Sequence, residues 1–136
     1  MRIAMVLLLA LCAANPAAAQ LSSIAVYQLE QAAVVGGSQL LIMQINLDTG
    51  DATKAAAARK EVLESAKKLD AAAPSALEAT KRNPALHAAV NEYYQAAAAL
   101  LAAAGSTKAE QKRLEATLDE RQKALDLEMK RAGFEK

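Results

Sequence analysis

Side chains that could do chemistry are few and dispersed in this sequence of 136 residues. His87 is the only histidine, and Cys12, the only cysteine, lies in an apolar N-terminal run. A metal site needs several converging histidine or carboxylate ligands, and the sequence offers neither an H-x-x-x-H nor an E-x-x-H pair. We therefore predict no bound metal, and we interpret His87, Asn91 and Tyr94 as one solvated or half-buried polar face of a helix.

Ser38 is the one serine whose surroundings suggest a nucleophile. It follows Gly36-Gly37, as in the turn that exposes a catalytic serine, but the closing glycine and the flanking strand of that motif are missing. A single histidine and no paired carboxylates on apolar faces leave no general base for it. We expect Ser38 to be an ordinary helix residue and the protein not to be an enzyme.

Haem is the cofactor that a small helical bundle could hold between facing helices. Covalent attachment needs a C-x-x-C-H motif, which is absent. Met43 and His87 would lie at opposite ends of an up-down bundle, and Met129, which is nearer to His87, is needed for packing. A b-type cytochrome-like haem bundle is therefore the alternative with the least support, and we predict no cofactor.

Neutral polar residues recur at helical spacing in the apolar segment 21–47. Amides and hydroxyls on such a helix either hydrogen-bond to a facing helix or line a small pocket. They could thus set the register of a bundle or a homodimer, or contact a neutral ligand. The candidate ligand-binding residues are Gln28, Gln31, Ser38 and Gln39.

The N-terminus has the pattern of a secretory signal peptide. One basic residue, Arg2, precedes an apolar run of about a dozen residues and the small-residue pattern Ala17-x-Ala19. We predict a signal peptide at 1–19, cleavage before Gln20 and a periplasmic mature chain of residues 20–136 that forms one domain. The run is shorter than the roughly 20 residues of a membrane-spanning helix, which argues against an uncleaved anchor or a stable span after cleavage. A lipoprotein at Cys12 is disfavoured because Leu11 stands where a small residue is required.

Charge is distributed unevenly along the chain. The formal net charge is +1, and loss of Arg2 leaves the mature part nearly neutral, so nothing draws it to nucleic acid. Between Gln20 and Gly50 the only acidic or basic residues are Glu30 and Asp48. This first mature helix must be buried nearly all round or shared with a partner. We predict self-association or a periplasmic protein partner, with an interface at Gly36, Gly37, Leu40 and Met43.

Helical periodicity and end signals divide the rest of the chain. A first helix starts after Ser22 or Ser23 and ends near Leu47, with Gly36-Gly37 at a close approach of another helix. Asp51 caps a second helix, which stops at or before Ala73 because Pro74 follows. Ser75–Glu78 opens a short turn, Asn83-Pro84 starts a third helix that ends at Gly105, and Thr107 caps a fourth that ends at Gly133. The expected inward residues are Ala55, Ala58, Val62, Ala66, Leu69 and Ala73; Leu86, Val90, Tyr93, Ala97, Leu100 and Ala104; and Leu114, Leu118, Leu125, Met129 and Ala132.

Three features resemble the PilJ-type periplasmic helical sensor module of type IV pilus chemotaxis transducers. They are a central glycine followed by Gln and Met residues in 37–44, a long charged second helix, and a third helix that opens with Asn83-Pro84. The family's first-helix motif carries arginines after the glycine, and this chain has none between Gln20 and Arg59. The resemblance thus implies the architecture of a sensor module and does not extend to an anion site.

These patterns predict an all-α, antiparallel up-down-up-down four-helix bundle. The function that they favour is an exported binding or interaction module without catalytic activity, and the resemblance implies a sensor-like role. The alternative is a small-molecule carrier or sensor with a pocket beside the first helix.

Overall fold

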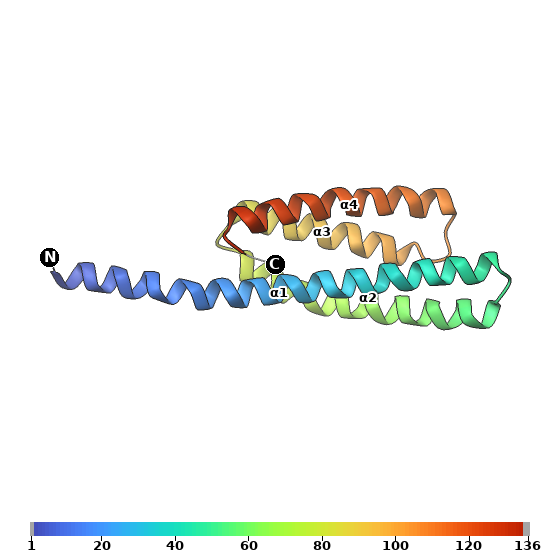
Figure 1. Cartoon of the computed structure of the whole chain (residues 1–136), viewed down its shortest axis with the longest axis horizontal. Helices are drawn as coiled ribbons and strands as arrows, with labels where there is room; N and C mark the ends of the chain where they lie inside the picture. Colours follow the sequence, from blue (N-terminus) through green and yellow to red (C-terminus); the bar gives the residue numbers. More distant parts are fainter. Residues whose placement is uncertain (1, 135–136) are drawn as a thin grey trace.

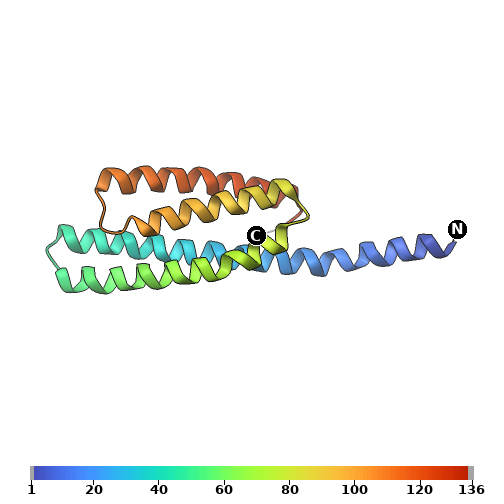
Figure 2. The same cartoon turned by 180° about the vertical axis from the view of Figure 1, so that it is seen from behind.

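The computed structural model describes the backbone of residues 2–134 and the side chains of residues 23–134. Within that range the chain forms four helices and no strand: α1 (Arg2–Asp48), α2 (Ala52–Thr80), α3 (Pro84–Ala102) and α4 (Lys108–Arg131). Consecutive helices run antiparallel, with α1 and α2 in one layer and α3 and α4 in the other (Figures 1 and 2). The predicted up-down-up-down four-helix bundle is confirmed.

The predicted helix caps at three turns are present. Side-chain oxygens of Asp51, Asn83 and Thr107 accept hydrogen bonds from backbone N–H groups three residues later, at 3.0, 3.2 and 3.2 Å. Gly133 has φ +82°, and the N–H of Phe134 donates to the carbonyl of Met129 at 3.0 Å, which is the Schellman ending predicted for α4. Short capped turns hold neighbouring helices antiparallel.

Two predicted helix boundaries were wrong. α1 is continuous through Ser22 and Ser23 and begins at Arg2. The predicted signal peptide and its cleavage site involve side chains outside those described. α2 runs through Pro74 to Thr80, although proline removes one helical hydrogen bond. After Pro74, the side chains of Ala76 and Thr80 are buried in the bundle. The last turns of α2 bend toward the start of α3 (Figure 2). Tertiary packing therefore outweighs the helix-stopping effect of the proline, and Ser75–Glu78 lies inside the helix.

The core follows the predicted stripes with local shifts. In α2, Ser65 is buried and Ala66 only partly so. Leu114 and Leu118 are also only partly buried, because α4 lies over one side of the bundle. Gln111 is buried, and its Nε2 donates to the carbonyl oxygen of Ala103 at 3.3 Å, which ties the α3–α4 turn to α4.

Gly36 marks the predicted close approach of another helix. A Cβ at this position would lie 2.7 Å from both terminal carbons of Leu101 in α3 and 3.0 Å from Cβ of Ser65 in α2. A Cβ at Gly37 would meet nothing within 4 Å. Close approach thus requires the first glycine of the pair and not the second.

Candidate functional site on the outer face of α1

The inner face of α1 fixes how this helix sits in the bundle. Val26, Leu29 and Leu40 are at most 1% exposed, and they pack in the central core together with Ala33 and Met43. α1 contacts α2 and, over a shorter stretch, α3. In the described part of the chain no Cα atom of α1 comes within 8 Å of one in α4. The bundle is therefore open between α1 and α4, and the opposite face of α1 has no helix over it.

That outer face carries a row of residues at alternating steps of three and four. We call this row the outer stripe: Ile24, Tyr27, Gln31, Val34, Ser38, Leu41 and Ile45. Its five apolar members are 47–58% exposed. Steps of three and four residues keep side chains on one face of a helix, and this is the spacing by which two helices pack along a shared seam. Val35 and Ile42 extend the apolar surface on one side of the stripe and are 47% and 43% exposed.

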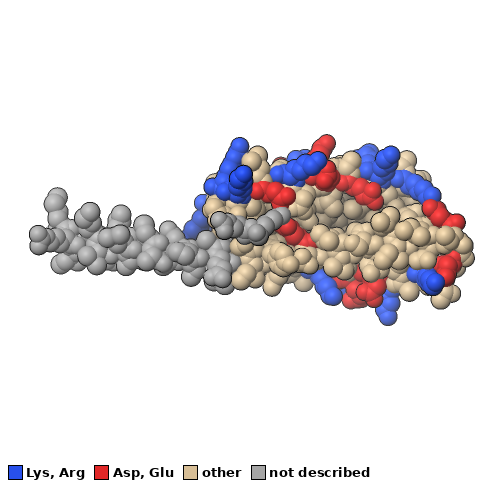
Figure 3. Space-filling view, in the orientation of Figure 1, with Lys and Arg blue, Asp and Glu red and all other residues tan. Residues whose placement is uncertain are grey.

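The outer stripe is also uncharged along most of its length, because no acidic or basic residue occurs from Gln31 to Leu47. Figure 3 shows the resulting contrast on one face of the molecule, where charged side chains gather along α4 and α2 on both sides of a neutral band. Isolated apolar residues are ordinary on protein surfaces, but a continuous apolar patch bordered by charge is typical of an interaction site.

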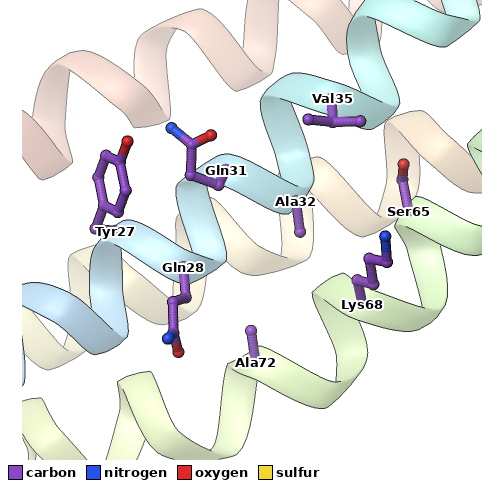
Figure 4. A pocket seen from close by; sticks show the side chains of 8 residues that line it. All are labelled: Tyr27, Gln28, Gln31, Ala32, Val35, Ser65, Lys68 and Ala72. Carbon is purple, nitrogen blue, oxygen red and sulfur yellow. The ribbon is translucent and has the colours of Figure 1, made fainter.

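Two grooves border the middle of α1, and a smaller one lies near its end at Met43 and Leu47. One, of about 360 Å³, lies between α1 and α2 and is lined by Gln28, Gln31, Val35, Lys68 and Ala72, among others (Figure 4). The other, of about 380 Å³, lies between α1 and α4. Gly37, Ser38 and the carboxylates of Glu115 and Asp119 are at its walls. Both grooves are mainly apolar and wide open to solvent.

The structure separates the four predicted ligand-binding residues. Gln28 and Gln31 line the α1–α2 groove, but in Figure 4 the Gln28 side chain extends toward α2 and the Gln31 side chain extends away from it. Ser38 lines the α1–α4 groove, and its hydroxyl donates to the carbonyl of Val34 at 2.9 Å. Gln39 is half-buried and lines neither of these two grooves. Gln31 and Ser38 belong to the outer stripe and Gln28 and Gln39 do not, so the four polar groups do not converge on one ligand.

The predicted interface residues need a correction. Gly36, Leu40 and Met43 are buried against the chain's own helices, so a second molecule cannot reach them in this fold. Only Gly37 is partly accessible, at the wall of the α1–α4 groove. The sequence indicated that α1 is apolar over most of its surface, but it did not indicate which of its faces the bundle would bury. The 3-4 spacing of the outer stripe was a signal that could have identified the other face.

A polar group is buried where α1, α3 and α4 meet. Tyr93 of α3 is 1% exposed, and Glu30 of α1 is 8% exposed. Burial raises the pKa of the Tyr93 hydroxyl, and the negative charges of Glu30 and Asp126 raise it further. Gln122 donates from Nε2 to Asp126 at 3.0 Å. Helical periodicity predicted Tyr93 as a core residue but gave no sign of its polar neighbours, because Glu30 comes from α1 and Asp126 from α4.

The residues weighed for chemistry have ordinary structural partners. His87 is half-buried, and its Nδ1 donates to the carbonyl of Leu77 at 2.9 Å, so the imidazole ties α3 to the end of α2. Tyr94 on the same face donates to Asp70 at 2.7 Å, and this hydrogen bond raises the pKa of the phenol. Over the described residues, no group of three or more His, Cys, Asp or Glu side chains could hold a metal ion. A search of the same residues finds no helix with the length and hydropathy to cross a membrane.

Comparisons with known proteins give no family or function for this chain. No protein-family model matches it, and searches of curated proteins and of solved structures returned no match.

Proposed function

We propose that this chain is an exported, non-catalytic binding module that works by pairing the outer stripe of α1 with an apolar helix. One observation carries the proposal. The described part of α1 buries one face in the bundle and leaves a second apolar face exposed, with 3-4 spacing and without charge from Gln31 to Leu47. The signal-peptide pattern at the N-terminus supports export, and the few dispersed reactive side chains support binding over catalysis.

Apolar burial supplies the driving force in this proposal. Covering one large aliphatic side chain contributes roughly 1.5–3 kcal/mol when it goes from exposed to fully buried. The five apolar members of the outer stripe start about half exposed, so pairing gains part of that value at each of them. Two such helices have no charged rows to desolvate, which keeps the cost of pairing low.

Photocrosslinking in cells that make the protein tests the proposal without assuming the partner's identity. A benzophenone amino acid replaces Val34 in the stripe, or Leu63 of α2 in the control, which is a lone apolar residue of similar exposure. We expect a discrete crosslinked product from position 34 and none from position 63. Absence of any product from positions 34, 41 and 45 would remove the proposal.

A second candidate function is a small-molecule carrier or sensor, favoured by the α1–α2 groove. Apolar walls with the polar groups of Gln28 and Lys68 at the edge suit a ligand with an apolar body and one polar end. In a thermal-shift screen, a ligand at a hundredfold excess over its Kd stabilises the fold by about 2.7 kcal/mol. Gln28→Ala should weaken that shift, and Gln39→Ala, outside the groove, should leave it unchanged. A broad panel of metabolites without any shift would count against this function.

A further inference from the structure

We infer that the helix which pairs with the outer stripe is α1 of a second copy of this chain, in antiparallel orientation, with the two-fold axis between Val34 and Val35. This inference rests on the proposed function and names its partner. It depends on the order of side chains along the stripe, on what flanks the stripe at each side, and on the surface that pairing would cover.

The order of side chains along the stripe is nearly the same from either end. With the two-fold axis between Val34 and Val35, Ile24 lies opposite Ile45 of the second copy, and the Gln31 amide lies opposite the Ser38 hydroxyl. Val34 then lies beside its own copy, Tyr27 lies beside Leu41 and Ile42, and the two polar members meet each other. Leu41 lies between Tyr27 and Gln28 of the second copy. A slip of two helical turns would place Ile24 opposite Ser38, or Ile45 opposite Gln31. The sequence of the stripe therefore specifies one antiparallel register.

The two flanks of the stripe decide the direction. On the α2 side, the apolar surface is widened by Val35, which lines the α1–α2 groove, and by Ile42 seven residues later. On the α4 side the corresponding positions are Glu30, Gly37 and Gln44. A parallel pair sets the α2 side of one helix against the α4 side of the other, whereas an antiparallel pair sets each side against its own copy. The third position of the α2 side is Gln28. An antiparallel pair brings Val35 against its own copy and Ile42 beside Tyr27 and Gln28, whereas a parallel pair sets both residues against the side of Glu30, Gly37 and Gln44.

Charge at the end of the stripe supports the same direction. Asp48 occupies the next position of the 3-4 spacing, and Lys108 of α4 donates to it at 2.7 Å. A parallel pair would bring the two Asp48 carboxylates together at one end. An antiparallel pair places them at opposite ends, where each keeps its own lysine.

The surface available is close to what a stable dimer needs. Half-exposed side chains of this size each leave on the order of 100 Å² to cover. The stripe with Val35 and Ile42 would then bury roughly 700 Å² per copy, near the roughly 800 Å² per partner of a standard interface.

Disulfide trapping in the purified full chain tests the dimer and its direction. All variants carry Cys12→Ser to remove the native thiol. Val34→Cys lies beside the axis in either direction and should give a covalent dimer on mild oxidation. Gln31→Cys and Ser38→Cys alone should stay monomeric, because each lies seven residues, about 10 Å, from its own copy along the axis, which is too far for a disulfide. The double variant with both cysteines should crosslink fully, and Leu63→Cys on α2 controls for random collisions.

Each outcome decides the matter. Covalent dimers from both Gln31→Cys alone and Ser38→Cys alone would mean a parallel pair and overturn the inferred direction. A covalent dimer from only one of these two variants would mean a register slipped by two turns and overturn the inferred register. No dimer from Val34→Cys, together with a monomer mass by light scattering at tens of micromolar, would overturn self-pairing. In that case a crosslink from position 34 to a different protein in cells would leave the proposed function intact. Failure at both levels would remove both.

Discussion

α1 and α4 each have one face that no other helix covers, and the two faces differ in chemistry. α4 leaves Arg113, Lys123 and Arg131 exposed and pairs each with a carboxylate three or four residues away on its own surface. α1 leaves Tyr27, Val34 and Leu41 exposed, with no ion pair between Gln31 and Leu47. The open face of α4 is suited to water, and the open face of α1 is suited to another apolar surface. The comparison shows that two helices of one bundle can expose a face to a similar extent and still differ in the chemistry of that face.

The largest expected effect comes from the two faces of α1. Leu29 is fully buried, so Leu29→Ala should lower the free energy of unfolding by about 2–5 kcal/mol through lost burial and an unfilled cavity. Ile45→Ala, at 53% exposure, should change it far less in a dilute monomer. Urea denaturation at low protein concentration measures both variants. Equal losses would mean that the two faces of α1 are not distinct.

The next effect concerns the two adjacent glycines. Gly37→Ala should stabilise the chain by up to about 1 kcal/mol, because alanine is a better helix former and the site is open. Gly36→Ala should lose this gain and destabilise by about 1–3 kcal/mol, because Leu101 must move within a packed core. Thermal unfolding of the matched pair gives the comparison directly. A gain for Gly36→Ala as large as that for Gly37→Ala would contradict the close approach.

An alkaline titration tests the buried phenol of Tyr93, which lies where α1, α3 and α4 meet. The pKa of Tyr93 is raised by folding, so its contribution to stability is present below the unfolded pKa of about 10 and is lost as pH rises above it. The unfolding free energy of the wild type should therefore fall above pH 10, and that of Tyr93→Phe should fall less. Tyr27→Phe, which removes a phenol hydroxyl from the exposed stripe, serves as the matched control. Parallel curves for Tyr93→Phe and the wild type would show that the buried phenol does not govern the loss.

The smallest expected effect is on the α3–α4 surface. Arg121 of α4 donates to Glu92 of α3 at 3.0 Å, and both side chains are about half exposed. Arg121→Ala should cost about 0.5 kcal/mol or less, since screened surface pairs contribute little. Thermal unfolding at low and high salt checks this. A loss of several kcal/mol that disappears in salt would mean that ion pairs, and not apolar packing, hold α4 in place.

Local chemistry in the sequence was enough to predict the helix count, the caps at Asp51, Asn83 and Thr107, and the ending at Gly133. These features depend on residues a few positions apart, so the chain specifies them before any tertiary contact forms. The continuation of α2 past Pro74 could not be predicted in this way. It depends on Ala76 and Thr80 finding buried positions in the assembled bundle.

The candidate site divides along the same line. The sequence by itself determined that the segment 21–47 is helical, apolar and almost free of charge. Only the tertiary structure decided which face of α1 is left open, because α2 and α3 cover the side of Gly36 and Leu40 and no helix covers the side of Val34 and Leu41. Periodicity in the sequence indicates that a helix has an apolar face. Which of two apolar faces is buried depends on how the other helices pack against it. The packing energy comes from contacts between residues far apart in the sequence, so local patterns do not predict it.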